Sequence, residues 1–62
     1  MRRQNLINFR KSKDMTIREM ARSLGVSKSY YEKIEYGERS PSYNFMRKFK
    51  DEYPNANIDF IL

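Results

Sequence analysis

Residues Ile17 to Tyr36, IREMARSLGVSKSYYEKIEY, contain the local signals that decide the fold. Ala21 is small enough to let two helices approach closely, and Gly25 stands where a helix end favours a positive φ angle. Ser27 then has the side chain of an N-cap for the next helix. This order of residues predicts two short helices joined by a tight turn.

Apolar and polar residues separate within the same stretch at helical spacing. The apolar residues recur so that both helices turn one face toward a common core. They are Met20, Leu24, Val26, Tyr31 and Ile34. The polar residues that point elsewhere are Arg18, Arg22, Lys28, Ser29 and Lys33. Spacing and charge therefore agree on a helix-turn-helix over residues 17–36.

Further helical segments flank this stretch. The expected segments are residues 3–13, residues 43–53 and the apolar tail IDFIL, residues 58–62. Thr16 and Glu19 stand at capping-box spacing at the start of the second helix. Gly37 should end the third helix, and Ser42 should cap the fourth. Because no strand-like alternation is present, we predict an all-α single domain over residues 1–62, a compact bundle of four to five short helices.

The composition restricts the function. Thirteen Lys and Arg against eight Asp and Glu leave a formal charge of +5 and a pI near 9.8, which favours a polyanionic partner such as nucleic acid. Without cysteine or histidine, disulfides, thiolate nucleophiles, imidazole bases and the usual zinc sites are excluded, and neither metal nor cofactor is expected. No apolar run approaches the roughly 20 residues of a membrane span, and a cytoplasmic protein is the simplest interpretation.

The string MTIREMARSLGVSKSYYEKIEYGERSPS, residues 15–42, resembles the Cro/cI-like helix-turn-helix family of bacterial and phage repressors, also called the xenobiotic-response-element family. The typical string of that family runs close to LTQEELAEKLGVSRSTISKIERGKRxPS. The likeness extends from about Arg10 to about Phe49. The shared residues include Gly25, Ile34, Glu35, Gly37 and Pro41. It implies a lambda-repressor-like fold that binds double-stranded DNA, commonly as a two-fold dimer.

Base contacts are assigned to the start of the third helix. A helix in the major groove places its first turn nearest the base edges, so side chains there must be polar and free of core contacts. Lys28, Ser29 and Lys33 meet these conditions, and the resemblance implies base contacts at the matching positions. Lysine donates to guanine O6 and N7, which mildly favours a G-containing half-site. Glu32 lies on the same side and either accepts from cytosine N4 or selects against wrong sites.

Phosphate contacts are expected from the ends of the second and third helices and from the loop that follows the third. The candidates are Arg18, Ser27, Tyr30, Arg39 and Tyr43. Arg39 can enter the minor groove instead, and Tyr30 can contact a thymine methyl or rest on the neighbouring helix. Tyr31 replaces the usual Ile or Val of the family, so its ring should be buried and its hydroxyl should find a polar partner or water.

The resemblance implies two further features. Arg10 and Glu35 match family positions that form a partly buried ion pair, which would tie the first helix to the end of the third. Ile17, by contrast, stands where the family usually has a Gln that bonds phosphate and braces the recognition helix. That clamp must be absent or replaced, with Thr16 or Arg18 as candidates for the phosphate contact.

The leading hypothesis is a Cro-like repressor that occupies a palindromic operator as a homodimer, at least when it is on DNA. The dimer candidates in or beside the C-terminal segment 54–62 are Tyr53, Ile58, Phe60, Ile61 and Leu62. The alternative for this segment is a lid packed on the protein's own core. The second hypothesis is a protein-interaction module, such as an antirepressor or antitoxin subunit, that grips a protein partner through IDFIL. We expect neither enzymatic activity nor a small-molecule substrate, because the carboxylates are scattered and no glycine-rich phosphate loop is present.

Overall fold

The computed structural model describes all residues from Met1 to Leu62, which form five helices and no strand. The helices are α1 (Gln4–Ser12), α2 (Ile17–Leu24), α3 (Lys28–Glu35), α4 (Tyr43–Glu52) and α5 (Ile58–Ile61). The prediction of an all-α bundle is confirmed. The tail IDFIL supplies the fifth helix, which is little more than a single turn.

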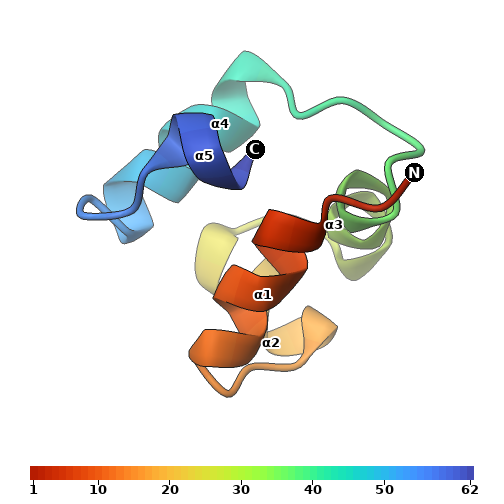
Figure 1. The fold of residues 1–62 in the computed structure, drawn as a ribbon, viewed down its shortest axis with the longest axis horizontal. Coiled ribbons are helices and arrows are strands. Elements are labelled where there is room, and N and C mark those ends of the chain that lie inside the picture. The colour runs from red at the N-terminus through yellow and green to blue at the C-terminus, as the bar shows by residue number, and fades with distance from the viewer.

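The helices pack so that α1 contacts both α3 and α5, while α2 contacts α3 and α4. Figure 1 shows the loop after α3 running across the top of the view to α4, and α5 lying above α1. The N-terminus lies beside the end of α3, where the Arg3 amide donates to the Glu35 carbonyl over 2.8 Å. The first residues of the chain are thus placed against the last turn of α3.

Local capping interactions determine where the helices begin. At α2 the Glu19 amide donates to Thr16 Oγ1 over 3.1 Å, and the Thr16 amide donates to Glu19 Oε1 over 2.8 Å, which completes the expected capping box. The side chains of Ser27 and Ser42 accept backbone hydrogen bonds at the starts of α3 and α4. Asn57 does the same at α5.

Three helices end in one hydrogen-bond pattern, in which a residue one or two positions after the helix is left-handed. Gly25 (φ 71°) and Gly37 (φ 78°) occupy this position after α2 and α3. At α2 the Val26 amide reaches back to the Ala21 carbonyl over 3.0 Å. Asp14 (φ 56°) takes the same place after α1, since Asp is one of the few side chains that tolerate this conformation.

One hydrophobic core joins all five helices. It consists of Leu6, Met20, Ala21, Leu24, Tyr31, Ile34, Phe45, Phe49 and Ile61. Phe9 is partly buried beside it and meets the Tyr53 ring edge-on, with centroids 5.2 Å apart. Ile61 is only 7% exposed, so most of its side chain packs on the protein's own core and little of it is left for contact with a second copy.

Candidate nucleic-acid interface

The helix α3 has one buried face and one exposed face. Tyr31, Ile34 and Glu35 are each no more than 1% exposed and anchor the helix to the core. The exposed side chains include Lys28, Ser29 and Lys33. A two-turn helix anchored along one side presents its first turn in a constant orientation, which is the geometry that major-groove binding needs.

Glu32 lies on α3 beside Lys28. Its Oε2 atom is 3.9 Å from Lys28 Nζ, and the two side chains are 34% and 47% exposed. A solvent-exposed pair one turn apart contributes only about 0.3–0.5 kcal/mol. Glu32 therefore lowers the local positive charge at the start of α3, while Lys28 can leave the pair at little cost.

Tyr30 rests on α4, which was one of the alternatives for this residue. Its ring meets the Phe45 ring edge-on, with centroids 5.9 Å apart. Its hydroxyl donates to Ser42 Oγ over 3.2 Å and accepts from the Ser42 amide over 3.3 Å. The Arg39 guanidinium lies 5.8 Å from the centre of the same ring. The fold thus brings Tyr30, Arg39 and Ser42 together.

The remaining phosphate candidates are exposed near the beginnings of three helices. Arg18 lies in the first turn of α2, and Ser27 is the cap of α3. Tyr43, the first residue of α4, is 69% exposed. The positive end of a helix dipole favours anions at such positions.

Ile17 packs instead of binding phosphate. Its side chain is partly buried against the core, and an aliphatic group has no donor for a phosphate oxygen. A different contact braces the turn before α3, because Lys48 Nζ donates to the Gly25 carbonyl over 3.3 Å. These residues are 23 positions apart, and no local pattern in the sequence indicates their contact.

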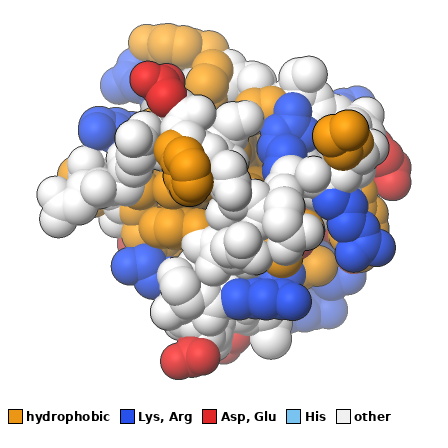
Figure 2. Space-filling view, viewed as in Figure 1, with side chains coloured by type: hydrophobic (Ala, Val, Ile, Leu, Met, Phe, Trp, Pro, Cys, Tyr) orange, Lys and Arg blue, Asp and Glu red, His pale blue; other side chains and the backbone are white.

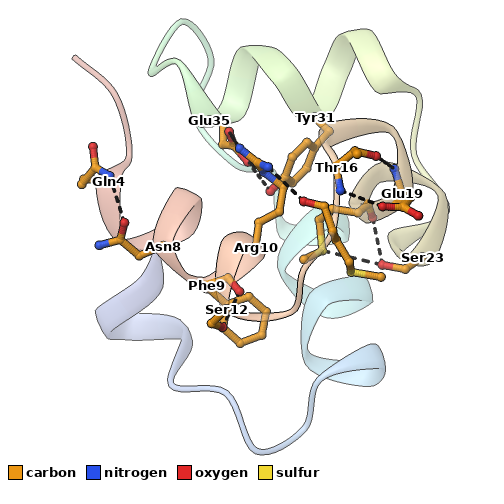
Figure 3. Close-up of polar contacts among 12 residues, drawn as sticks. Gln4, Asn8, Phe9, Arg10, Ser12, Thr16, Glu19, Ser23, Tyr31 and Glu35 are labelled. Atoms are coloured by element: carbon orange, nitrogen blue, oxygen red, sulfur yellow. Dashed lines mark hydrogen bonds and ion pairs between the residues drawn. The ribbon is translucent and has the colours of Figure 1, made fainter.

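The carboxylate of Glu35 is the centre of a buried polar network (Figure 3). Arg10 donates to it twice, from Nε to Oε2 over 2.7 Å and from Nη2 to Oε1 over 3.2 Å. The Tyr31 hydroxyl donates to Oε2 over 2.6 Å. Arg10 also donates from Nη1 to the Met15 carbonyl over 3.0 Å. The network ties α1 to the last turn of α3 and gives the buried Tyr31 hydroxyl its polar partner.

This network shifts two pKa values. The hydrogen bond to Glu35 raises the pKa of Arg10 above its ordinary value, although desolvation opposes the shift. Burial raises the pKa of Tyr31 well above its ordinary value of about 10, and the hydrogen bond to Glu35 raises it further. The folded protein therefore keeps Arg10 charged and Tyr31 neutral.

We expect Tyr31 to stay protonated in the folded protein at a pH where free tyrosine ionises. Because its pKa is higher in the folded than in the unfolded state, its contribution to stability is complete below about pH 10 and is lost as the pH rises toward the folded-state value. Ultraviolet titration of the five tyrosines should show a late step that coincides with alkaline unfolding. The Tyr31→Phe variant should lack that step, and its persistence would show that another tyrosine is responsible.

Basic side chains are unevenly distributed on one face of the molecule. Figure 2 shows the face formed by α1 and α5, where Lys and Arg atoms gather mainly toward the side on which α3 and the N-terminus lie in Figure 1. The centre of this face is largely uncharged, with hydrophobic atoms exposed over α5.

No group of three His, Cys, Asp or Glu side chains is arranged to hold a metal ion. None of the five helices has the length and apolar character needed to cross a membrane.

A family model described as helix-turn-helix matches residues 6–49, which is most of the chain. No curated protein and no solved structure gives a significant match. The chain belongs to the Cro/cI-like helix-turn-helix family, so the resemblance found in the sequence is confirmed. It is a DNA-binding regulator of transcription whose partner is double-stranded DNA. Members of this family are generally not enzymes.

Proposed function

We propose that this protein is a Cro-type repressor that occupies a two-fold symmetric operator and reads it with α3. The observation that carries the proposal is the construction of α3, in which the inner face is at most 1% exposed while Lys28, Ser29 and Lys33 are exposed. A helix held in one orientation presents the same donors to the base edges at every encounter. Occupancy of the operator then blocks transcription.

The two lysines and the serine are proposed to read bases, and Glu32 to tune that reading. Lys28 and Lys33 would donate hydrogen bonds to guanine. The Ser29 hydroxyl can donate or accept, so it would pair with base edges of either kind. In the free protein Glu32 lies 3.9 Å from Lys28, so it competes with the DNA for this ammonium group. A DNA site that does not attract Lys28 away from Glu32 is therefore bound more weakly.

Backbone contacts are proposed around this helix. The residues assigned to phosphates are Arg18, Ser27, Tyr30, Arg39 and Tyr43. Arg39 and Tyr30 would act together, because the guanidinium already lies over the ring and is held beside the start of α4. Such contacts orient the protein on the duplex but carry no sequence information.

Selection of bound fragments from a pool of random DNA tests the proposed function. We expect an inverted repeat with half-sites centred about 10 base pairs apart, each with at least one guanine in the region that α3 covers. Binding should weaken steeply with salt, since each neutralised phosphate releases condensed counterions. Recovery of a single asymmetric half-site, or no enrichment, would contradict the two-fold operator.

The face formed by α1 and α5 is proposed to contact a second copy of the chain. A groove there is lined by Asn5, Asn8, Phe9, Ala56, Asn57, Phe60 and Ile61, none of which is charged. Phe60 is 66% exposed, and Asn5 Nδ2 donates to its carbonyl over 3.0 Å. Because the whole chain carries a charge of +5, two copies meet with least repulsion on an uncharged face. Ile58, Leu62 and Tyr53 flank this face, but they are already partly buried against the core.

The Phe60→Ser change is expected to reduce the dimer fraction and leave the fold intact, because the ring lies mostly outside the protomer. Analytical ultracentrifugation with and without operator DNA measures this. Tyr43→Ser is the matched control in the absence of DNA, since Tyr43 is equally exposed at 69% but lies on α4. If both variants dimerise like the wild type, the α1–α5 face is not the interface.

The same exposed Phe60 supports a second candidate function, in which α5 binds a different protein, as an antirepressor or antitoxin subunit would. Changing Lys28 and Lys33 to alanine separates the two functions. DNA affinity should fall under the repressor proposal, whereas binding of a partner through α5 should survive the change.

A further inference from the structure

One backbone carbonyl in the last turn of α3 has no hydrogen-bond donor among the residues that follow it in the chain. Gly37 ends the helix, and the Glu38 amide reaches back to the Lys33 carbonyl over 2.9 Å, while the Gly37 amide donates to the Ile34 carbonyl over 3.2 Å. The Glu35 carbonyl receives no donor from the residues that follow it. A buried helix end needs a partner for such a group.

Arg3 supplies that partner from the opposite end of the chain. Its amide donates to the Glu35 carbonyl over 2.8 Å, and its Nη1 atom donates to the Ile34 carbonyl over 2.8 Å. The same Nη1 atom donates to the Arg39 carbonyl over 3.2 Å. One residue therefore closes the helix and also binds the loop that follows it, across a separation of 31 to 36 positions.

The residues around Arg3 reinforce this closure. The Met1 carbonyl lies against Gly37, where a Cβ atom on any other residue would collide with it. The Arg2 guanidinium lies 5.0 Å from the centre of the Tyr36 ring. A guanidinium at the C-terminal end of a helix also interacts favourably with the negative end of its dipole.

The loop beyond α3 is thereby held at both ends. Arg3 binds the backbone of Arg39, and the Arg39 guanidinium lies over the ring of Tyr30. Tyr30 in turn holds Ser42 at the start of α4. A basic side chain that is restrained before binding loses less conformational entropy when it contacts a phosphate.

We infer that Arg3 is a positioning residue for the DNA interface, which closes the end of α3 and holds Arg39 beside its phosphate. The inference rests on the proposed function, in which α3 and the loop after it contact DNA. Arg3 itself is half-buried and donates to backbone carbonyls, so it acts through Arg39 rather than on DNA.

The test compares the affinities of Arg3→Gln and Arg2→Gln for the selected operator. Both changes remove one positive charge from the same segment, but the Arg2 side chain makes no hydrogen bond. We expect Arg3→Gln to weaken binding about tenfold and Arg2→Gln about twofold. Arg3→Lys keeps the charge, but its nitrogen ends one atom short of the position of Nη1, which donates to both carbonyls, so it should still bind about fivefold more weakly than the wild type. Equal losses for Arg3→Gln and Arg2→Gln, or full recovery by Arg3→Lys, would overturn the inference.

Measurements in an Arg39→Ala protein separate a positioning role of Arg3 from a general effect of Arg3 on stability. When Arg39 is already alanine, Arg3→Gln should cost only about twofold in affinity, the loss expected from the missing charge, because the group to be positioned is absent. An undiminished loss on that background would mean that Arg3 does not act through Arg39. All affinities are measured where circular dichroism shows each variant to be folded.

Amide hydrogen exchange provides a readout that does not need DNA. The Gly37 and Glu38 amides should exchange faster in Arg3→Gln and Arg3→Lys than in Arg2→Gln, because the side-chain bonds to the Ile34 and Arg39 carbonyls are lost while only the backbone bond to Glu35 remains. Equal exchange in all three variants would also overturn the inference.

The proposed function is tested separately: if Lys28→Ala with Lys33→Ala binds the operator like the wild type, α3 is not the reading helix. If that double variant loses binding while Arg3→Gln matches Arg2→Gln, only the role of Arg3 is rejected.

Discussion

Replacing Arg10 by methionine is expected to destabilise the protein by about 3 to 5 kcal/mol, because it leaves the Glu35 carboxylate buried without its ion-pair partner. Glu35 is only 1% exposed, and its carboxylate would keep a single side-chain donor, the Tyr31 hydroxyl. A domain of 62 residues has a stability of only about 3 to 9 kcal/mol. The variant should therefore lose a third or more of the stability of the fold, as measured by urea or thermal denaturation.

Removing both partners of this pair is the informative control. The double change Arg10→Met with Glu35→Leu deletes the buried charge together with its partner, and it should recover much of the lost stability. Lys11→Met, one residue away on the exposed side of α1, should change stability by less than about 0.5 kcal/mol. If Arg10→Met proved no more harmful than Lys11→Met, the network would not stabilise the fold.

Changing Lys28 and Lys33 together to alanine is expected to lower affinity for the operator by at least about 30-fold, because each base contact contributes roughly 1–3 kcal/mol of discrimination. The ratio of operator binding to binding of unrelated DNA should fall as well. Both side chains are exposed and make no hydrogen bond in the free protein, so stability should hardly change. Titration with fluorescent operator and scrambled duplexes measures both quantities.

The matched control for this loss is the double variant Lys11→Ala with Lys50→Ala. It removes the same charge from exposed positions on α1 and near the end of α4. We expect it to weaken binding to all duplexes by a similar, smaller factor, since only long-range attraction is reduced. An equal loss of discrimination in the two double variants would mean that charge alone, and not the start of α3, selects the operator.

The boundaries of the helix-turn-helix could be predicted because their signals are local. Thr16 and Glu19 are one helical turn apart, Gly25 stands directly after α2, and Gly37 follows the Tyr36 cap of α3. Interactions of this range depend on the order of residues alone. The end of α1 was less clearly marked, because Asp14 takes a left-handed conformation that is more typical of glycine.

The surroundings of the candidate site were less predictable. The exposure of Lys28 and Lys33 follows from helical periodicity, and the structure agrees. Tyr30 had several alternatives, because an aromatic ring with a hydroxyl suits either a DNA contact or a neighbouring helix. Its position against Ser42 depends on how α4 packs, which periodicity within α3 does not specify.

The amino-acid sequence by itself determined the helix-turn-helix, its capping residues and its family, since these depend on neighbours within about a turn of one another. Only the tertiary structure decided that Arg3 closes α3 and that Ile61 belongs to the core. Contacts of this kind join residues far apart in the chain, and they form only when the helices adopt a particular mutual packing. Spacing along a sequence specifies which face of a helix is apolar, but it contains no distance between one helix and another.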